Sequence, residues 1–77
     1  MKVHELKIRP EFYGDVVECL KTFELRQDDR GYEVGDVLIL QEYDNGKFTG
    51  RRIAKTIKYI LRGPCYGLKD GWCILAI

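Results

Sequence analysis

Asp44-Asn45-Gly46-Lys47 is the strongest local structural signal in this chain. An Asn-Gly pair readily adopts the positive φ values of a type I′ turn, whose twist matches that of two antiparallel strands. The residues on either side of the turn are therefore expected to form a β-hairpin with a largely fixed register. Before the turn, residues 37–40 read Val-Leu-Ile-Leu, and such a continuous apolar run favours a strand buried on both faces.

Further segments have the alternation or the apolar composition of β-strands. They cover residues 4–8, 22–26, 53–61 and 72–77. The segment 53–61 is apolar at most odd positions, so we expect one long, half-buried strand there. Almost every residue of the last segment is apolar, which predicts a central or covered strand. In residues 22–26, Phe23 and Leu25 share one face, and we expect both side chains to enter the core.

One helix is expected between the first two of these strands. Pro10 suits the first turn of a helix, and Tyr13, Val16, Val17 and Leu20 follow the spacing of an apolar helical stripe, so the helix should extend to about Leu20. All 77 residues are expected to form a single domain around one core. The predicted fold class is mainly β (α+β): a small β-barrel of five or six strands, with the helix at its end or side. Closure would remove exposed sheet edges. A flat α+β sandwich is the alternative.

Composition excludes several classes of protein. The chain is 45% hydrophobic and 32% charged, with a net charge of +1, which is typical of a folded globule and unlike the strongly basic charge of many nucleic-acid-binding domains. No apolar run approaches the ~20 residues needed to cross a bilayer. The charged N-terminus does not resemble a signal peptide, so we expect a cytoplasmic protein with no membrane partner. Cys19, Cys65 and Cys73 are odd in number and widely spaced, which favours reduced thiols. With one histidine and no closely paired cysteines, the sequence predicts no metal site and no cofactor.

Residues 21–26, Lys-Thr-Phe-Glu-Leu-Arg, combine a strand pattern with a cluster of charges. Because side chains alternate across a strand, Glu24 and Arg26 are expected to share the face opposite the apolar side chains. A carboxylate and a guanidinium, with the ammonium of Lys21 nearby, can bind a phosphate or a planar polar group. Alternation does not place Lys21 on that face, so its position depends on the bend from helix to strand. The alternative is a row of surface ion pairs, which contribute about 0–1 kcal/mol.

Other candidates for this site lie on neighbouring segments. Asp29 and Arg30 belong to the polar loop after the charged strand, and His4 and Lys7 belong to the first expected strand. Tyr66 lies in a loop and is the best candidate for an exposed aromatic that stacks on a base. Turn formation and core packing are the structural alternatives for these residues. A solvated basic strand face is expected from Arg51, Arg52, Lys55 and Lys58.

The order and spacing of these motifs resemble a known family. The segments that carry the resemblance are His4-Glu5-Leu6-Lys7-Ile8, Lys21-Thr22-Phe23-Glu24-Leu25-Arg26, Asp29-Arg30, Tyr32-x-Val34-Gly35-Asp36, Leu38-x-Leu40-x-Glu42-Tyr43, Thr49-Gly50-Arg51, Tyr59-Ile60-Leu61 and Tyr66-Gly67-Leu68. Together they resemble the DUF3850 domain family, often encoded in phages and bacteria, within the ASCH domains of the PUA-like superfamily. In the ASCH motif G-x-K-x-x-E-x-R, Lys21, Glu24 and Arg26 match, and Cys19 replaces the glycine. A glycine there would end the helix in the left-handed conformation, so with cysteine the helix is expected to end one or two residues differently.

The resemblance implies a PUA-like barrel that binds RNA or a nucleotide-like ligand in a polar cleft between helix and barrel. Two alternatives remain open. One is a small amidohydrolase-like enzyme acting on a modified nucleoside, with Lys21 or Glu24 taking part in the chemistry. The other is a protein-interaction or accessory domain without a ligand site. The sequence is compatible with a monomer and predicts no particular oligomeric state. The candidate ligand-binding residues are Lys21, Glu24, Arg26, Asp29, Arg30, His4, Lys7 and Tyr66.

Overall fold

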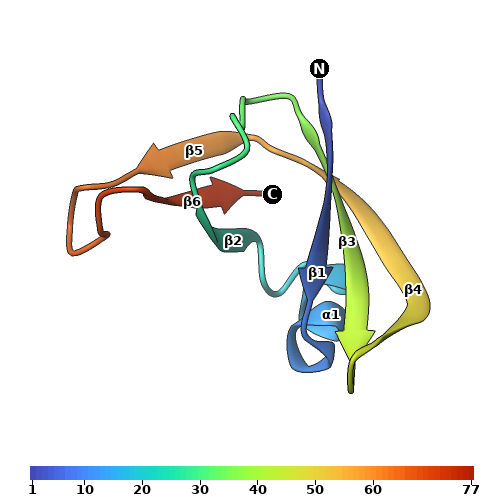
Figure 1. Cartoon of the computed structure of the whole chain (residues 1–77). Coiled ribbons are helices and arrows are strands. Elements are labelled where there is room, and N and C mark those ends of the chain that lie inside the picture. Colours follow the sequence, from blue (N-terminus) through green and yellow to red (C-terminus); the bar gives the residue numbers. More distant parts are fainter.

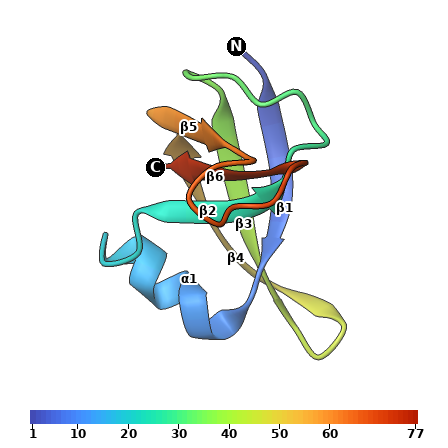
Figure 2. The same ribbon diagram turned by 90° about the vertical axis from the view of Figure 1, so that its left-hand side faces the viewer.

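The computed structural model describes residues 1–77 and contains six strands and one helix. Their order is β1 (Val3–Ile8), α1 (Pro10–Val17), β2 (Phe23–Gln27), β3 (Val37–Asp44), β4 (Lys47–Thr56), β5 (Tyr59–Arg62) and β6 (Trp72–Ala76), as Figure 1 shows. The predicted class, mainly β with one early helix, is confirmed. The strands pair as two three-stranded sheets, β1-β3-β4 and β2-β6-β5, and the ladders do not close into the expected barrel. In Figure 2 the second sheet lies in front of the first.

The Asn-Gly hairpin is confirmed, and it makes β3 the centre of the first sheet. Asn45 and Gly46 have φ values of 49° and 78°, and the flanking residues pair across the turn. On its other side β3 pairs in parallel with β1. Leu38 and Leu40 are fully buried, whereas Val37 and Ile39 on the opposite face are only half-buried. The strand is therefore central, but only one of its faces is fully covered.

The prediction of one long strand over residues 53–61 is wrong. The chain leaves the first sheet at the end of β4 and enters the second sheet at the start of β5. Between them lies Ile57, whose side chain is fully buried and whose N–H donates to the Asp36 carbonyl at 2.9 Å. Because Ile57 occupies the core, apolar residues continue to alternate between β4 and β5, so the sequence pattern gives no sign that the strand ends there. The covered strand predicted at the C-terminus is confirmed, since β6 is the middle strand of the second sheet.

Helix α1 ends at Val17 rather than near Leu20. Cys19 adopts a left-handed φ of 59°, and its N–H donates to the Val16 carbonyl at 3.1 Å. The Leu20 N–H donates to the Asp15 carbonyl at 2.8 Å. These two bonds form a Schellman motif, in which glycine is the residue that usually takes the left-handed position. Cysteine thus takes the glycine's conformation, and the chain turns sharply toward β2.

The hydrophobic core lies between the two sheets and the buried side of α1. It consists of Leu6, Ile8, Tyr13, Val16, Tyr32, Leu38, Leu40, Ile57, Cys73, Leu75 and Ile77. Helix α1 contacts β3 and contributes Tyr13 and Val16 to this cluster. No helix in the structure is both long enough and apolar enough to span a bilayer.

The predicted orientation of β2 is wrong: its apolar side chains face outward and its carboxylate faces inward. Phe23 and Leu25 are 48% and 53% exposed, whereas Glu24 is only 4% exposed. The register pairs Glu24 with Leu75, a core residue of β6, and partners in an antiparallel ladder share a face. Inward burial of a charge is tolerated because Glu24 is paired with two cations there.

Candidate functional site

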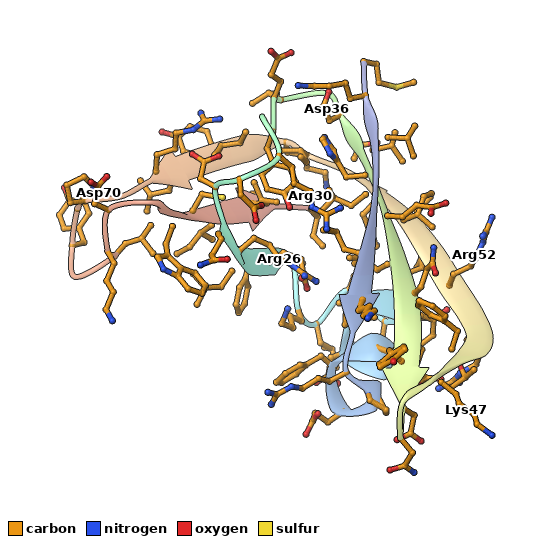
Figure 3. The ribbon with its side chains drawn as sticks, viewed as in Figure 1. Arg26, Arg30, Asp36, Lys47, Arg52 and Asp70 are labelled. Atoms are coloured by element: carbon orange, nitrogen blue, oxygen red, sulfur yellow. The ribbon has the colours of Figure 1, made fainter.

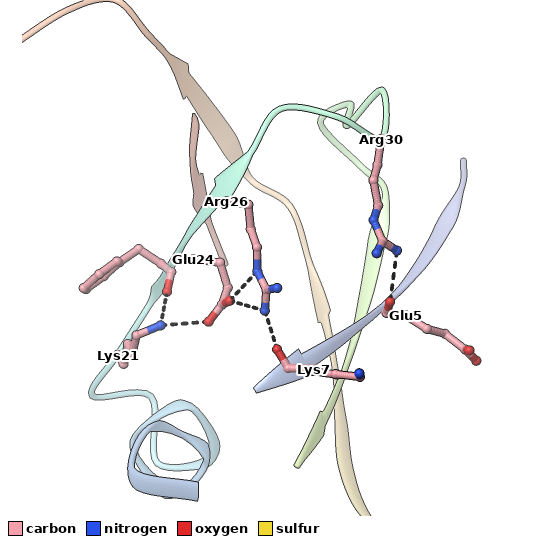
Figure 4. Close-up of polar contacts among 7 residues, drawn as sticks. Glu5, Lys7, Lys21, Glu24, Arg26 and Arg30 are labelled. Atoms are coloured by element: carbon pink, nitrogen blue, oxygen red, sulfur yellow. Dashed lines mark hydrogen bonds and ion pairs between the residues drawn. The ribbon is translucent and has the colours of Figure 1, made fainter. Parts of the chain in front are cut away.

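Glu24 is the centre of the candidate site. Its side chain is 5% exposed, and each of its oxygens accepts a charged hydrogen bond. Lys21 Nζ lies 2.7 Å from Oε1, while Arg26 Nε and Nη2 lie 3.0 Å and 2.9 Å from Oε2 (Figure 4). Charge-assisted hydrogen bonds of this length are stronger than hydrogen bonds between neutral groups. Glu24 and Arg26 therefore lie on one face, as alternation predicts, and Lys21, whose position alternation left open, joins them there.

The bend after α1 brings Lys21 to this face. After the turn at Cys19, the Lys21 side chain reaches back so that Nζ also donates to the Phe23 carbonyl at 2.8 Å. The same ammonium lies 5.4 Å from the Phe12 ring centre and 4.9 Å from that of Phe23, distances at which a cation is attracted to an aromatic face. Local turn geometry, and not strand alternation, places this lysine.

Arg26 connects β2 to the first sheet. Its Nη2 donates to the Lys7 carbonyl at 2.6 Å, near the end of β1 (Figure 4). Arg30, on the loop after β2, donates from Nη1 to the Glu5 carbonyl at 3.1 Å. Both arginine side chains extend toward β1 in Figure 3. Two residues of the predicted set thus cross the gap between the two sheets.

A pocket of about 370 Å³ opens between the end of β1, the start of α1 and β2. Its lining is Lys7, Ile8, Arg9, Phe12, Lys21, Phe23, Glu24, Leu25 and Arg26. A second pocket of about 340 Å³ shares Lys7 and Arg26 with it and extends to Arg30 and Phe48. We refer to the two together as the basic cleft. It contains five of the eight predicted ligand-binding residues: Lys7, Lys21, Glu24, Arg26 and Arg30.

The other predicted site residues lie elsewhere. Asp29 is exposed in the loop after β2, and Tyr66 is exposed in the turn before β6, and neither lines the cleft. His4 is buried: its Nε2 lies 2.9 Å from Asp36 Oδ2, and its ring meets Tyr32 edge-on at 4.8 Å. Asp36 lies toward the N-terminal end of β1, away from Arg26 (Figure 3).

Asp36 is held by several donors at the start of β3. Besides His4, the backbone N–H groups of Lys2 and Glu33 donate to its carboxylate at 2.9 Å and 3.0 Å. The hydrogen bond with His4, followed by that from Lys2, lowers the pKa of Asp36 to about 2. This cluster joins β1 to the loop before β3, so His4 has a structural role here.

Sequence reasoning missed a second buried carboxylate, Glu42 on β3. Arg51 binds it in a bidentate manner at 2.9 Å and 2.8 Å, and the Thr49 hydroxyl donates to it at 2.7 Å. The hydrogen bonds from Arg51 and then Thr49 lower the pKa of Glu42 to about 2. The Arg51 guanidinium also lies 4.9 Å from the Tyr13 ring centre, so it is not a free member of a basic strip.

A signal for this pair was present in the sequence. Glu42 follows Leu38 and Leu40 at a spacing of two, so it belongs to the same inward face of β3. A buried carboxylate requires a partner, and the hairpin register brings the Arg51 segment next to that end of β3.

Comparison with known proteins identifies the chain's relatives. An uncharacterized 12.9 kDa protein in the GpA 3′ region of Escherichia phage P2 is 45% identical over 56 residues, or 73% of this chain and 51% of the phage protein. The chain therefore spans about half the length of this curated relative. The family model for DUF3850, a domain of unknown function, matches residues 3–77. Because that match covers nearly every residue from β1 to the C-terminus, the chain belongs to the DUF3850 family.

Proposed function

We propose that this protein binds RNA or a nucleotide-like ligand in the basic cleft. The observation that carries the proposal is the combination of cations and exposed aromatic rings around one pocket. Lys7, Arg9, Lys21 and Arg26 line it together with Phe12 and Phe23, which are 39% and 48% exposed. Single-stranded nucleic acids are typically bound by grooves that attract phosphates with cations and stack bases on aromatic faces.

Within this proposal, Glu24 positions the cations and does not contact the ligand. Both of its oxygens already accept hydrogen bonds from Lys21 and Arg26. Arg26 uses Nε and Nη2 for Glu24 and the Lys7 carbonyl, which leaves Nη1 for a phosphate or a base edge. A guanidinium held rigidly on one side loses little conformational entropy when it binds an anion with the other.

The Lys-x-x-Glu-x-Arg motif supports the proposal through its resemblance to ASCH domains of the PUA-like superfamily. A cytoplasmic location suits such a ligand. The enzyme alternative is less well supported, because a nucleophilic lysine must be an uncharged amine. Lys21 instead forms an ion pair with Glu24 at 2.7 Å. We therefore favour a binding module over a hydrolase.

Fluorescence anisotropy with a labelled single-stranded RNA tests the proposal. Lys21 and Arg26 compensate a buried carboxylate, so the informative change is the double variant Lys7→Ala with Arg9→Ala. The logarithm of the binding constant falls linearly with the logarithm of the salt concentration, and each lost phosphate contact should reduce the steepness of that line by about 0.7. The two substitutions together should weaken binding at low salt about tenfold or more. The matched control is Lys58→Ala with Lys69→Ala, which removes the same charge at exposed positions outside the cleft. Equal loss in both variants, or no binding by the wild type at low salt, would refute the proposal.

A further inference from the structure

One face of the second sheet is apolar and uncovered. Ladder partners share a face, so the register aligns Phe23 with Ala76 and Tyr59, and Leu25 with Ile74 and Leu61. Trp72 and Gln27 form a further pair on that side. The face contains no charged residue. We call it the outer apolar face, and its residues are Phe23, Leu25, Gln27, Tyr59, Leu61, Trp72, Ile74 and Ala76.

Much of this face is open to solvent, although Leu61, Trp72, Ile74 and Ala76 are half-buried. The opposite side of the sheet contributes Leu75 and Cys73 to the core, with Ile60 packed against them. On the outer side, Phe23, Leu25 and Tyr59 are 48%, 53% and 64% exposed. In Figure 2 no helix or strand lies in front of this sheet, although the loop between β5 and β6 crosses in front of β2. Uncovered apolar patches of this kind mark interaction sites in soluble proteins.

We propose that the outer apolar face is the interface of a symmetric homodimer, in which the two β2-β6-β5 sheets pack face to face. A two-fold axis brings the same patch of each copy together, so the patch must be complementary to itself. A surface with two apolar cross-strand rows and no charge meets that condition, because no like charges are brought together. Aligned packing of two such sheets about 10 Å apart is the ordinary geometry of a β-sandwich.

The area and the size of the core both favour a second copy. Large aromatic side chains carry roughly 150–250 Å² each, so this face, together with the neighbouring Leu20 (72% exposed), presents on the order of 600 Å². Two copies would bury about 1,200 Å², at the lower end of stable interfaces. Only 15 of 77 residues are buried in the single chain, and its three cysteines are free. Domains this small commonly gain stability from disulfides, metals or oligomerisation.

An interface of this size predicts a dimer whose dissociation constant is in the micromolar range. Sedimentation velocity from about 1 μM to about 500 μM protein should therefore show a monomer–dimer equilibrium. Leu25→Glu and Tyr59→Glu place a charge on opposite edge strands of the face, and each should raise the dissociation constant at least about tenfold because buried like charges would oppose each other. Both positions are more than half exposed, so the single chain should keep its fold, which circular dichroism checks.

The matched control is Val34→Glu, which replaces an apolar side chain that is 63% exposed in the loop before β3, outside the face. This variant should dimerise like the wild type. A wild type that remains monomeric at every concentration would overturn the proposal. Dimers that persist unchanged in both face variants, or that are lost equally in the control, would also overturn it.

Discussion

Arg26→Ala is the substitution that most directly tests how the buried carboxylate is stabilised. The change removes two charged contacts with Glu24, at 3.0 Å and 2.9 Å, and the bond from Nη2 to the Lys7 carbonyl that joins the two sheets. Removing one partner of a buried ion pair costs about 3–5 kcal/mol. Lys21 remains 2.7 Å from Glu24, so we expect the free energy of unfolding to fall by about 2–3 kcal/mol.

Thermal and urea denaturation followed by circular dichroism measures this loss. For a domain of this size, 2–3 kcal/mol corresponds to a decrease in Tm of roughly 10–20 °C. If the cost arises from an uncompensated charge, Glu24→Gln in the Arg26→Ala background should recover about 1–2 kcal/mol. The control is Arg52→Ala, since Arg52 is exposed and lies on the outer side of β4 (Figure 3). It should change stability by less than about 0.5 kcal/mol. An Arg26→Ala effect as small as that of the control would show that the cluster is only a surface ion pair.

The turn and the two other carboxylates give further predictions. Cys19→Gly should raise the free energy of unfolding by about 1 kcal/mol, because Cys19 has a left-handed φ of 59° that glycine adopts without strain; chemical denaturation measures it, and Cys19→Ala should give no gain. The pKa values of Asp36 and Glu42 are lowered to about 2 from 3.8 and 4.5, so the unfolded chain binds more protons between these values. The contribution of these two carboxylates to the free energy of unfolding should therefore be fully present above pH about 4.5 and be lost as the pH decreases to about 2. Urea titrations across this range should give a flatter profile for Glu42→Gln, and an unchanged slope would contradict the assignment.

Local sequence patterns predicted the elements well where one residue type controls the backbone. Asn45-Gly46 sets the hairpin, and Pro10 begins the helix as expected. The clustering of Glu24 with Arg26 also follows from alternation along a strand. In each case the deciding interaction involves residues close in sequence. The fold class and the grouping of Glu24 with Arg26 could therefore be predicted.

The errors share one physical cause, which is that burial depends on what the rest of the chain covers. Alternation in β2 divides its residues into two faces correctly, but it does not say which face meets the core. Apolar side chains normally face the core, yet Glu24 faces inward here because Lys21 and Arg26 compensate its charge. Likewise, because Ile57 is buried, the alternation of apolar residues continues from β4 into β5, and the sequence predicted one strand where the structure has two strands in different sheets.

The hairpin, the single helix, the mainly β class and the grouping of Glu24 with Arg26 follow from the amino-acid sequence. These depend on backbone preferences and on side-chain period, which are local properties. The separation of the two sheets, the buried contact of His4 with Asp36 and the pairing of Arg51 with Glu42 depend instead on long-range packing. The same packing leaves Phe23 and Leu25 facing solvent, because the second sheet turns its other face toward the first sheet.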